Sequence, residues 1–176
     1  RTLAVALARE GGTQIYTMPV SGGNPTRLTQ SSAIDTEPVY TADGRSIYFV
    51  SDRGGGPQIY RMGAGGGGAE RVTFNGSYNI SPTLSPDGKA IAFISRQGGA
   101  FRVSLQEMDS GAVRQLSDTT EDERPSFAPN GRLLVYATRM RGADVLMTTT
   151  LDGKIKSRLV VSSGDVREPC WGPFGR

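Results

Sequence analysis

The sequence predicts an all-β protein, a β-propeller made of four-stranded antiparallel blades, because three columns of residues recur with one period. The first prolines of the repeats are spaced by 44, 43 and 44 residues, at Pro38, Pro82, Pro125 and Pro169. Turn glycines keep the same intervals, at Gly44, Gly88, Gly131 and Gly175. The other columns are Ile15-Tyr16, Ile59-Tyr60, Val103-Ser104, Leu146-Met147 and Leu28-Thr29, Val72-Thr73, Leu116-Ser117, Leu159-Val160. A period in the low forties with several short strands is typical of propeller blades.

Each repeat is predicted to hold four strands, as in "EPVYTADGRSIYFVS" from Glu37. We expect a short inner strand after the proline, because the missing N–H of proline costs no ladder bond on an edge. "ADGR", "PDGK" and "PNGR" then predict tight hairpin turns. The next strand, at 47–50 or 133–137, is an unbroken apolar run and should be buried on both faces. Glycine-rich turns lead to the third strand and to an outer strand near "RLT" or "RVT".

We expect residues 1–176 to form a single propeller domain or a fragment of one, with blade boundaries near 34, 78, 122 and 166. Arg1 aligns with Arg45, Lys89 and Arg132, so the chain begins at the second strand of a blade. It holds about four blades' worth of sequence, and its last lone strand could complete the first blade. A start within a blade indicates a fragment, whose open edges would tend to pair with other chains.

Composition argues against several kinds of function. The net charge is +3 and the basic residues are scattered, so nucleic-acid binding is not predicted. The sequence has no histidine, which removes Ser-His-Asp and Cys-His catalysis and histidine metal sites. The single cysteine, Cys170, cannot form an internal disulfide, and we expect it to be buried. We therefore predict no catalytic residue, no metal and no cofactor.

Three features leave alternatives open. "GAGGGG" at 63–68 contains the G-x-G-x-x-G pattern, but no helix follows it, so a turn is favoured over a nucleotide site. The acidic run at 121–123 fits a solvated loop better than paired carboxylates or a calcium site. The column Tyr40, Leu84, Phe127, Trp171 is expected to pack between blades instead of forming a ligand platform.

The links that cross from one blade to the next are the best candidates for function, because they differ between repeats while the scaffold columns hold. They lie on one face of a propeller, around the mouth of its channel. Dissimilar polar groups on a rigid frame make a binding surface; the alternative is an ordinary solvated loop. The candidate partner-binding residues are Thr36, Glu37, Asn79, Glu123, Arg124, Arg167 and Glu168.

At these motifs the sequence resembles the C-terminal β-propeller of the TolB family. The specific stretches are "GSYNISPTLSPDGKAIAFISRQGG", "DERPSFAPNGRLLVYATRMRG" and "GDVREPCWGPF". The resemblance implies a non-enzymatic periplasmic protein of the Tol-Pal system, which links the outer membrane to cell division and maintains envelope integrity. It implies protein partners, namely the peptidoglycan-associated lipoprotein Pal at the channel mouth, other Tol proteins and colicins that exploit the same surface. Any contact with the outer membrane would be through a partner.

The resemblance carries over to the sites only in part. Thr36 and Glu37 match the family's Thr-Glu-Pro motif at the Pal-facing mouth, and the other candidates occupy equivalent links. The family has six blades and a preceding α/β domain, whereas this chain holds about four blades' worth. The alternative function is the propeller domain of a peptidase or a sugar lyase of the same repeat superfamily.

Overall fold

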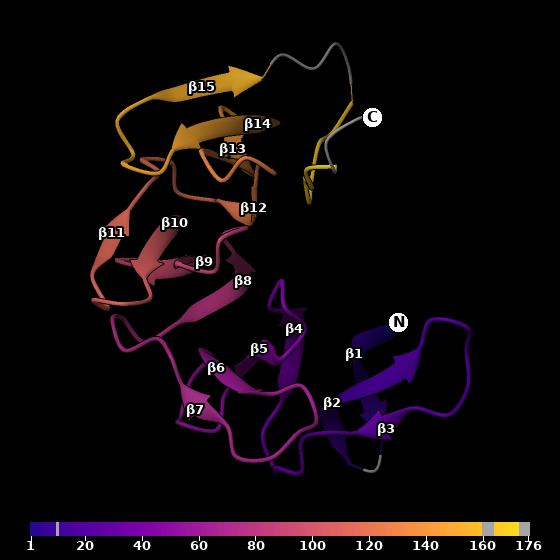
Figure 1. Cartoon of the computed structure of the whole chain (residues 1–176). Helices are drawn as coiled ribbons and strands as arrows, with labels where there is room; N and C mark the ends of the chain where they lie inside the picture. Colours follow the sequence, from indigo (N-terminus) through magenta and orange to yellow (C-terminus); the bar gives the residue numbers. More distant parts are fainter. Residues whose placement is uncertain (10, 160–163, 173–176) are drawn as a thin grey trace. The chain divides into compact units, whose positions relative to one another are not determined.

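The computed structural model describes residues 1–9, 11–159 and 164–172, and in these residues all regular structure is β (Figure 1). Gly175 and Val160 of the predicted columns lie outside the described residues. The strands are β1 (Thr2–Arg9), β2 (Gly12–Pro19), β3 (Thr26–Arg27), β4 (Asp35–Tyr40), β5 (Ser46–Ser51), β6 (Gln58–Gly63), β7 (Glu70–Arg71), β8 (Asn79–Leu84), β9 (Ala90–Gln97), β10 (Ala100–Glu107), β11 (Val113–Gln115), β12 (Glu123–Phe127), β13 (Leu133–Met140), β14 (Ala143–Thr150) and β15 (Lys156–Leu159).

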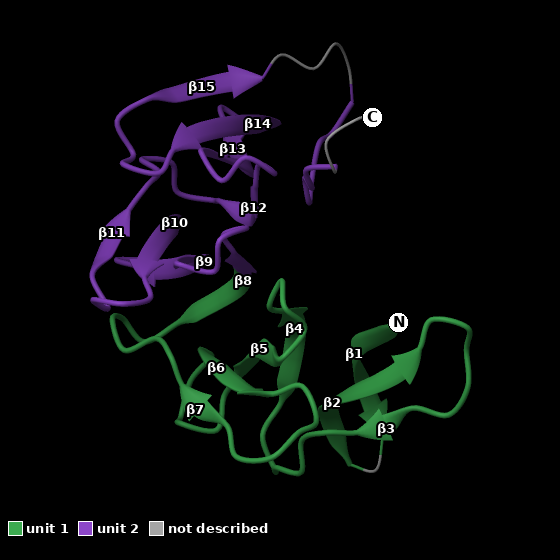
Figure 2. Ribbon diagram, viewed as in Figure 1, with its two compact units in different colours: residues 1–82 green, residues 83–176 purple. Residues whose placement is uncertain are grey.

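The strands form repeated antiparallel sheets, one for each sequence repeat. Three sheets have four strands, in the orders β4-β5-β6-β7, β8-β9-β10-β11 and β12-β13-β14-β15, and β1-β2-β3 forms a three-stranded sheet. The predicted all-β repeat of four-stranded sheets is confirmed. The chain divides into two compact units, residues 1–82 and 83–176 (Figure 2). Strands β4 and β8 begin one residue after the expected boundaries near 34 and 78, and β12 begins just after 122.

The inner strands β4, β8 and β12 begin before their prolines, which corrects the expectation that the strand follows the proline. In β4 the ladder pairs Thr36 with Val50 and then Val39 with Tyr48, so one extra residue bulges out between them. The same shift occurs in β12 between Glu123 and Ser126. Pro38 and Pro125 thus sit inside bulges, where no ladder hydrogen bond needs the missing N–H of proline.

The recurring column that contains Thr29, Thr73 and Ser117 extends the ladder with side-chain hydrogen bonds. The hydroxyl of Thr29 accepts a hydrogen bond from the Ile15 N–H at 3.0 Å, and Thr73 does the same for Ile59 at 3.0 Å. In the next repeat Ser117 accepts from the Val103 N–H at 2.9 Å. All three hydroxyls are buried. The outer strands can therefore be very short, because a hydroxyl satisfies the next N–H of the third strand.

The predicted hairpin turns are held by the chemistry of their acidic residue. Asp43 Oδ1 accepts hydrogen bonds from the Thr41 hydroxyl at 2.6 Å and from the Arg45 N–H at 3.0 Å. These hydrogen bonds lower the pKa of Asp43, and the bond from the Thr41 hydroxyl has the larger effect. Gly44 follows with φ 69°, a left-handed value that glycine adopts without the Cβ strain of other residues. The turn therefore needs both members of the Asp-Gly pair.

The core of the first unit joins its two sheets. Ile15, Ile47, Phe49, Tyr60 and Met62 form one buried cluster, against which Tyr40 packs. The interpretation of the aromatic column as packing thus fits Tyr40, and Phe127 is also buried. Trp171 departs from it, because 37% of its surface is exposed.

The second unit buries Tyr136, whose exposed fraction is 0%. Burial raises the pKa of Tyr136 to about 12, although the nearby Thr119 side chain opposes the rise. The folded state therefore favours neutral tyrosine. The resulting contribution to the free energy of unfolding is fully present below pH 10.0, the ordinary pKa of tyrosine. It is lost as the pH rises through the folded value.

We expect the Tyr136→Phe variant to lose less stability than the parent protein between about pH 10 and pH 12. A difference of two pKa units corresponds to about 2.7 kcal/mol in the free energy of unfolding, and this is the upper limit of the effect. Urea unfolding of both proteins at a series of pH values measures it. Parallel losses in the two proteins would contradict the assignment.

Candidate functional site

The candidate residues occupy three consecutive positions at the start of the inner strands, and these positions have different roles. The first position contains Asp35, Asn79 and Asp122 and is buried in each case. The second contains Thr36, Ile80, Glu123 and Arg167. The third directly precedes the proline and contains Glu37, Ser81, Arg124 and Glu168.

The buried first position anchors the links between sheets. Asp35 accepts two hydrogen bonds from Arg53 Nη2, at 3.0 Å to each oxygen, and one from the Ser31 hydroxyl at 3.1 Å. The Arg53 guanidinium also lies over the rings of Phe49 and Tyr60, at 5.3 Å and 5.0 Å from their centroids. Asp122 holds its own link by accepting from the hydroxyls of Ser117 and Thr119.

Asn79 belongs to this buried set and is not available to a partner. Its exposed fraction is 0%, and its Nδ2 donates to Gln58 Oε1 and to the Asn75 carbonyl, each at 2.8 Å. The equivalent of Glu37 in this repeat is Ser81, which the sequence analysis missed. Taking the residue before each proline would have found it.

The four residues before the prolines share an unusual backbone conformation. Glu37, Ser81, Arg124 and Glu168 have φ values of 51°, 53°, 46° and 48°. This left-handed region costs a residue with a Cβ about 1 kcal/mol or more, and proline disfavours helical angles in the residue before it. In β4 and β12 this residue also lies in a bulge, which directs its side chain away from the regular alternation.

In the first unit, this redirection links two repeats. The Glu37 carboxylate accepts a hydrogen bond from the Ser81 N–H at 2.6 Å, and the Ser81 hydroxyl lies 3.4 Å from its other oxygen. Thr36, Glu37 and Ser81 are all partly exposed. Glu37 thus fixes the start of the next inner strand while part of its surface stays open to solvent.

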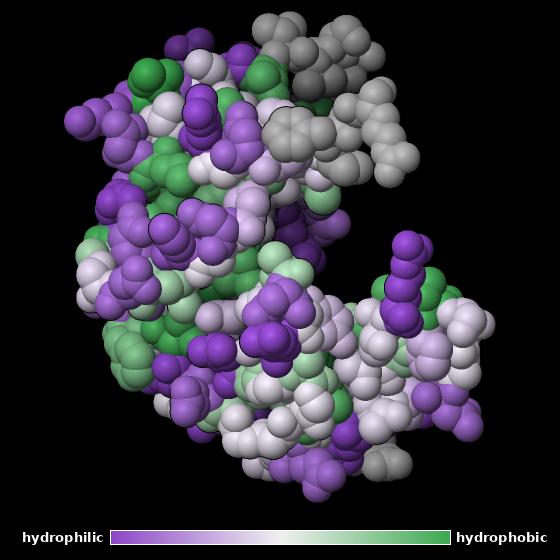
Figure 3. Space-filling view, in the orientation of Figure 1, coloured by the Kyte–Doolittle hydropathy of each residue, from purple (hydrophilic) through white to green (hydrophobic). Residues whose placement is uncertain are grey.

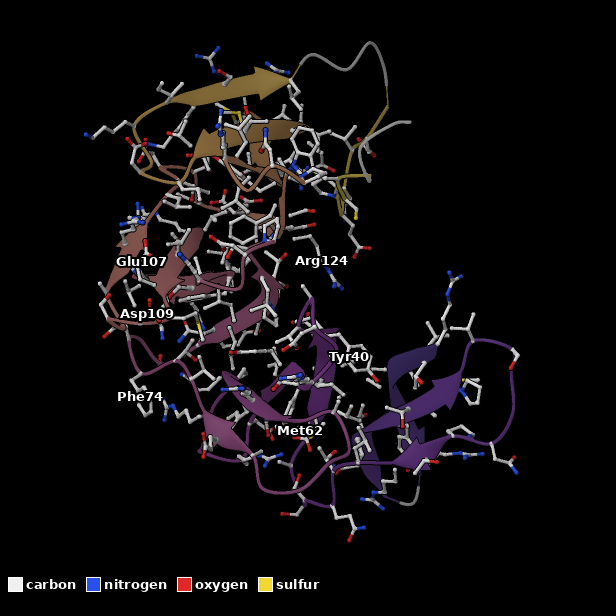
Figure 4. All side chains as sticks on the ribbon, in the orientation of Figure 1. Tyr40, Met62, Phe74, Glu107, Asp109 and Arg124 are labelled. Atoms are coloured by element: carbon white, nitrogen blue, oxygen red, sulfur yellow. The ribbon has the colours of Figure 1, made fainter. Side chains whose placement is uncertain are left out.

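In the second unit the equivalent residues carry opposite charges. Arg124 Nε lies 3.5 Å from Glu168 Oε1, and their side chains are 49% and 66% exposed. Figure 4 shows Arg124 extending away from its strand. Arg167 Nε donates to Asp144 Oδ2 at 3.0 Å, and this bond, followed by the charges of Asp144 and Glu123, raises the pKa of Arg167.

A polar cavity of about 200 Å³ lies beside Arg167 and Glu123 in the second unit. Its charged lining also includes Glu121, Arg139 and Asp144. The acidic run at 121–123 therefore has two separate roles: Asp122 is buried as an anchor, and its neighbours are exposed at the cavity.

Among the described residues, no three cysteine or carboxylate side chains lie close enough together to hold a metal ion. No helix in the described part of the chain could cross a bilayer. Cys170 is exposed, which makes the expectation of burial wrong; the described residues around it form no strand that could cover it. Hydrophilic, neutral and hydrophobic residues are interspersed over the face seen in Figure 3.

Repeated antiparallel sheets, most of them four-stranded, define a domain of the β-propeller class. The family profile described as the TolB beta propeller domain matches residues 1–175. The chain belongs to this family.

Individual relatives agree with the family match. The Tol-Pal system protein TolB of Bordetella pertussis is 51% identical over 164 residues, which are 93% of this chain and 37% of that protein. TolB of Polaromonas sp. is 64% identical over 67 residues, 38% of this chain and 16% of the relative. The crystal structure of TolB from Acinetobacter baumannii matches with a TM-score of 0.90 and 43% identity, over 98% of this chain and 44% of that one. The chain therefore spans less than half the length of these relatives.

Proposed function

We propose that the chain is a non-enzymatic, periplasmic protein-binding module of the Tol-Pal system, and that it docks the lipoprotein Pal. The docking residues are the exposed second and third positions of the inner strands. In the first unit these are Thr36 and Glu37, joined by Ser81. Glu123, Arg124, Arg167 and Glu168 occupy the same positions in the second unit and are assigned by repeat equivalence.

The observation that carries the proposal is the left-handed residue before each proline. The backbone strain recurs in four repeats, while the side chain at that position changes from Glu to Ser, Arg and Glu. Strain that persists at one position of a repeat is typical of functional sites, because the surrounding fold must maintain it. Polar groups set in this way fix the register of a partner, and a few anchors supply most of the affinity.

The names of the relatives supply the partner class. They are Tol-Pal system proteins, so we infer protein partners: Pal first, then other Tol proteins, and colicins at the same surface. Attachment to the outer membrane is through Pal. No observation favours the alternative of a peptidase or sugar lyase. Likenesses to a puromycin-hydrolyzing peptidase and an oligogalacturonate lyase, at 15% and 16% identity, show the fold alone.

We expect Thr36→Ala and Glu37→Ala each to weaken Pal binding at least tenfold, or about 1.4 kcal/mol, without unfolding the protein. Glu37→Ala should also lower the free energy of unfolding by about 1–2 kcal/mol, because the Ser81 N–H loses its acceptor. Calorimetric titration of the whole protein with Pal measures the affinity, and thermal unfolding measures the stability.

Two further variants separate contact from stability. Glu37→Gln keeps an acceptor for the Ser81 N–H and removes only the charge, so its stability should stay close to that of the parent. Glu70→Ala removes an equivalent charge from the exposed outer strand β7 of the same sheet and should bind Pal normally. Unchanged affinity in both Thr36→Ala and Glu37→Ala would overturn the assignment.

A further inference from the structure

The sequence contains two Asn-Gly pairs, Asn75-Gly76 and Asn130-Gly131. This pair is the most reactive context for loss of the side-chain amide of asparagine, because glycine has no Cβ to hinder its backbone nitrogen. The nitrogen of the glycine attacks Cγ of the asparagine, a C–N bond closes a five-membered imide, and ammonia leaves with the amide nitrogen. Water then opens the imide at either carbonyl, giving aspartate or isoaspartate. No oxidant or reductant is needed.

The structure leaves the reacting groups of the first pair free. Asn75 and Gly76 are exposed in the loop between β7 and β8. Among the contacts of the described residues, neither the Asn75 carboxamide nor the Gly76 N–H has a hydrogen-bond partner. The two main-chain carbonyls of the pair are held: that of Asn75 by Asn79 Nδ2 at 2.8 Å, and that of Gly76 by Gln58 Nε2 at 3.2 Å.

The second pair has both reacting groups engaged. Asn130 Oδ1 accepts a hydrogen bond from the Arg132 N–H at 3.0 Å, which fixes the orientation of the carboxamide. The Gly131 N–H donates to the Ala128 carbonyl at 2.8 Å. Attack within this pair would require both hydrogen bonds to break, and the tight turn of the hairpin to open.

We propose that Asn75 is a site of spontaneous deamidation in the folded protein and that Asn130 is protected. The isoaspartate product routes the main chain through the former side chain and turns the Asn75 carbonyl into a free carboxylate. This change removes the neutral acceptor of Asn79, the buried residue two positions before Ser81. Modification therefore alters the anchor at the start of β8 and adds a negative charge to the loop.

The test is incubation of the folded protein at mildly alkaline pH, followed by tryptic peptide mapping. We expect the peptide of residues 72–89 to gain the mass of an amide-to-acid change, assigned to residue 75 by fragmentation. The peptide that ends at Arg132 should keep its amide over the same period. The peptide also contains Asp87-Gly88, which can form isoaspartate by itself. Isoaspartate at residue 75 is therefore measured as the reaction with isoaspartyl methyltransferase that exceeds the reaction of the same peptide from the Asn75→Gln variant.

Two controls make the result decisive. In the denatured chain both pairs lose their structure, so both peptides should become modified at similar rates. The Asn75→Gln variant, whose longer side chain forms the cyclic imide far more slowly, should remove the modification at residue 75 from the folded protein. An unmodified Asn75, or equal modification of Asn75 and Asn130 in the folded state, would overturn the proposal.

Discussion

The Phe49→Ala variant is expected to lose about 3–5 kcal/mol of the free energy of unfolding. Phe49 is fully buried in the cluster that joins the two sheets of the first unit. Truncation removes its transfer energy and leaves a cavity that rigid β-sheets fill poorly. It also removes one of the two rings beneath the Arg53 guanidinium. Urea denaturation with an unchanged m-value would assign the whole loss to stability.

Phe74 provides the matched control. It lies in the loop after β7, is 71% exposed, and is labelled in Figure 4. Arg71 lies 5.1 Å from the centroid of its ring, and an exposed contact of this kind contributes about 1 kcal/mol at most. Phe74→Ala should therefore change stability by less than about 1 kcal/mol. A loss below 1 kcal/mol for Phe49→Ala would show that the first unit does not depend on this core.

The Arg53→Met variant should cost about 3–5 kcal/mol, more than Asp35→Ala. The order follows from exposure, because the side chain of Asp35 is 0% exposed and that of Arg53 is 26% exposed. Loss of the arginine leaves a charge in the interior, whereas loss of the aspartate leaves a guanidinium that water still reaches. Methionine is a natural choice, since Met140 stands at the equivalent position two repeats later.

The double variant Asp35→Ala/Arg53→Met should be more stable than Arg53→Met alone, because it removes the isolated carboxylate. Chemical denaturation of the parent, the two single variants and the double variant completes the double-mutant cycle. Arg114→Met is the control for a surface pair, since Arg114 and Glu107 are 44% and 36% exposed, and it should cost less than about 1 kcal/mol. Equal costs for Arg53→Met and Arg114→Met would rule out the buried pair as an anchor.

The regular part of the fold could be predicted from the sequence because its causes are local. The Asp-Gly pair at Asp43 and Gly44 predicts a tight hairpin turn. The apolar run before Ser51 predicts a strand that is buried on both faces. A fixed period then places these elements in equivalent sheets. The threonine of each "RLT" or "RVT" was found as a column, although its role as acceptor for the third strand became clear only from the hydrogen bonds.

The site was harder to predict because a buried residue is followed directly by two residues that are partly or fully exposed. Asn79 and Glu37 seemed equivalent as polar residues in links, yet one is buried and the other is open to solvent. Bulges cannot be located by hydrophobic alternation, since they break it. Likewise, nothing in the sequence distinguishes the Arg53 that binds Asp35 from the other scattered arginines, because that contact joins residues 18 positions apart.

The left-handed residue before each proline also bears on how such a protein can change. Its backbone is set by the bulge and the proline, so the side chain can be exchanged without rebuilding the strand. Glutamate, serine and arginine already occupy this position in a single chain. The residue before the proline can therefore change from repeat to repeat while the surrounding scaffold keeps its structure, so substitutions can alter the charge of this surface one residue at a time.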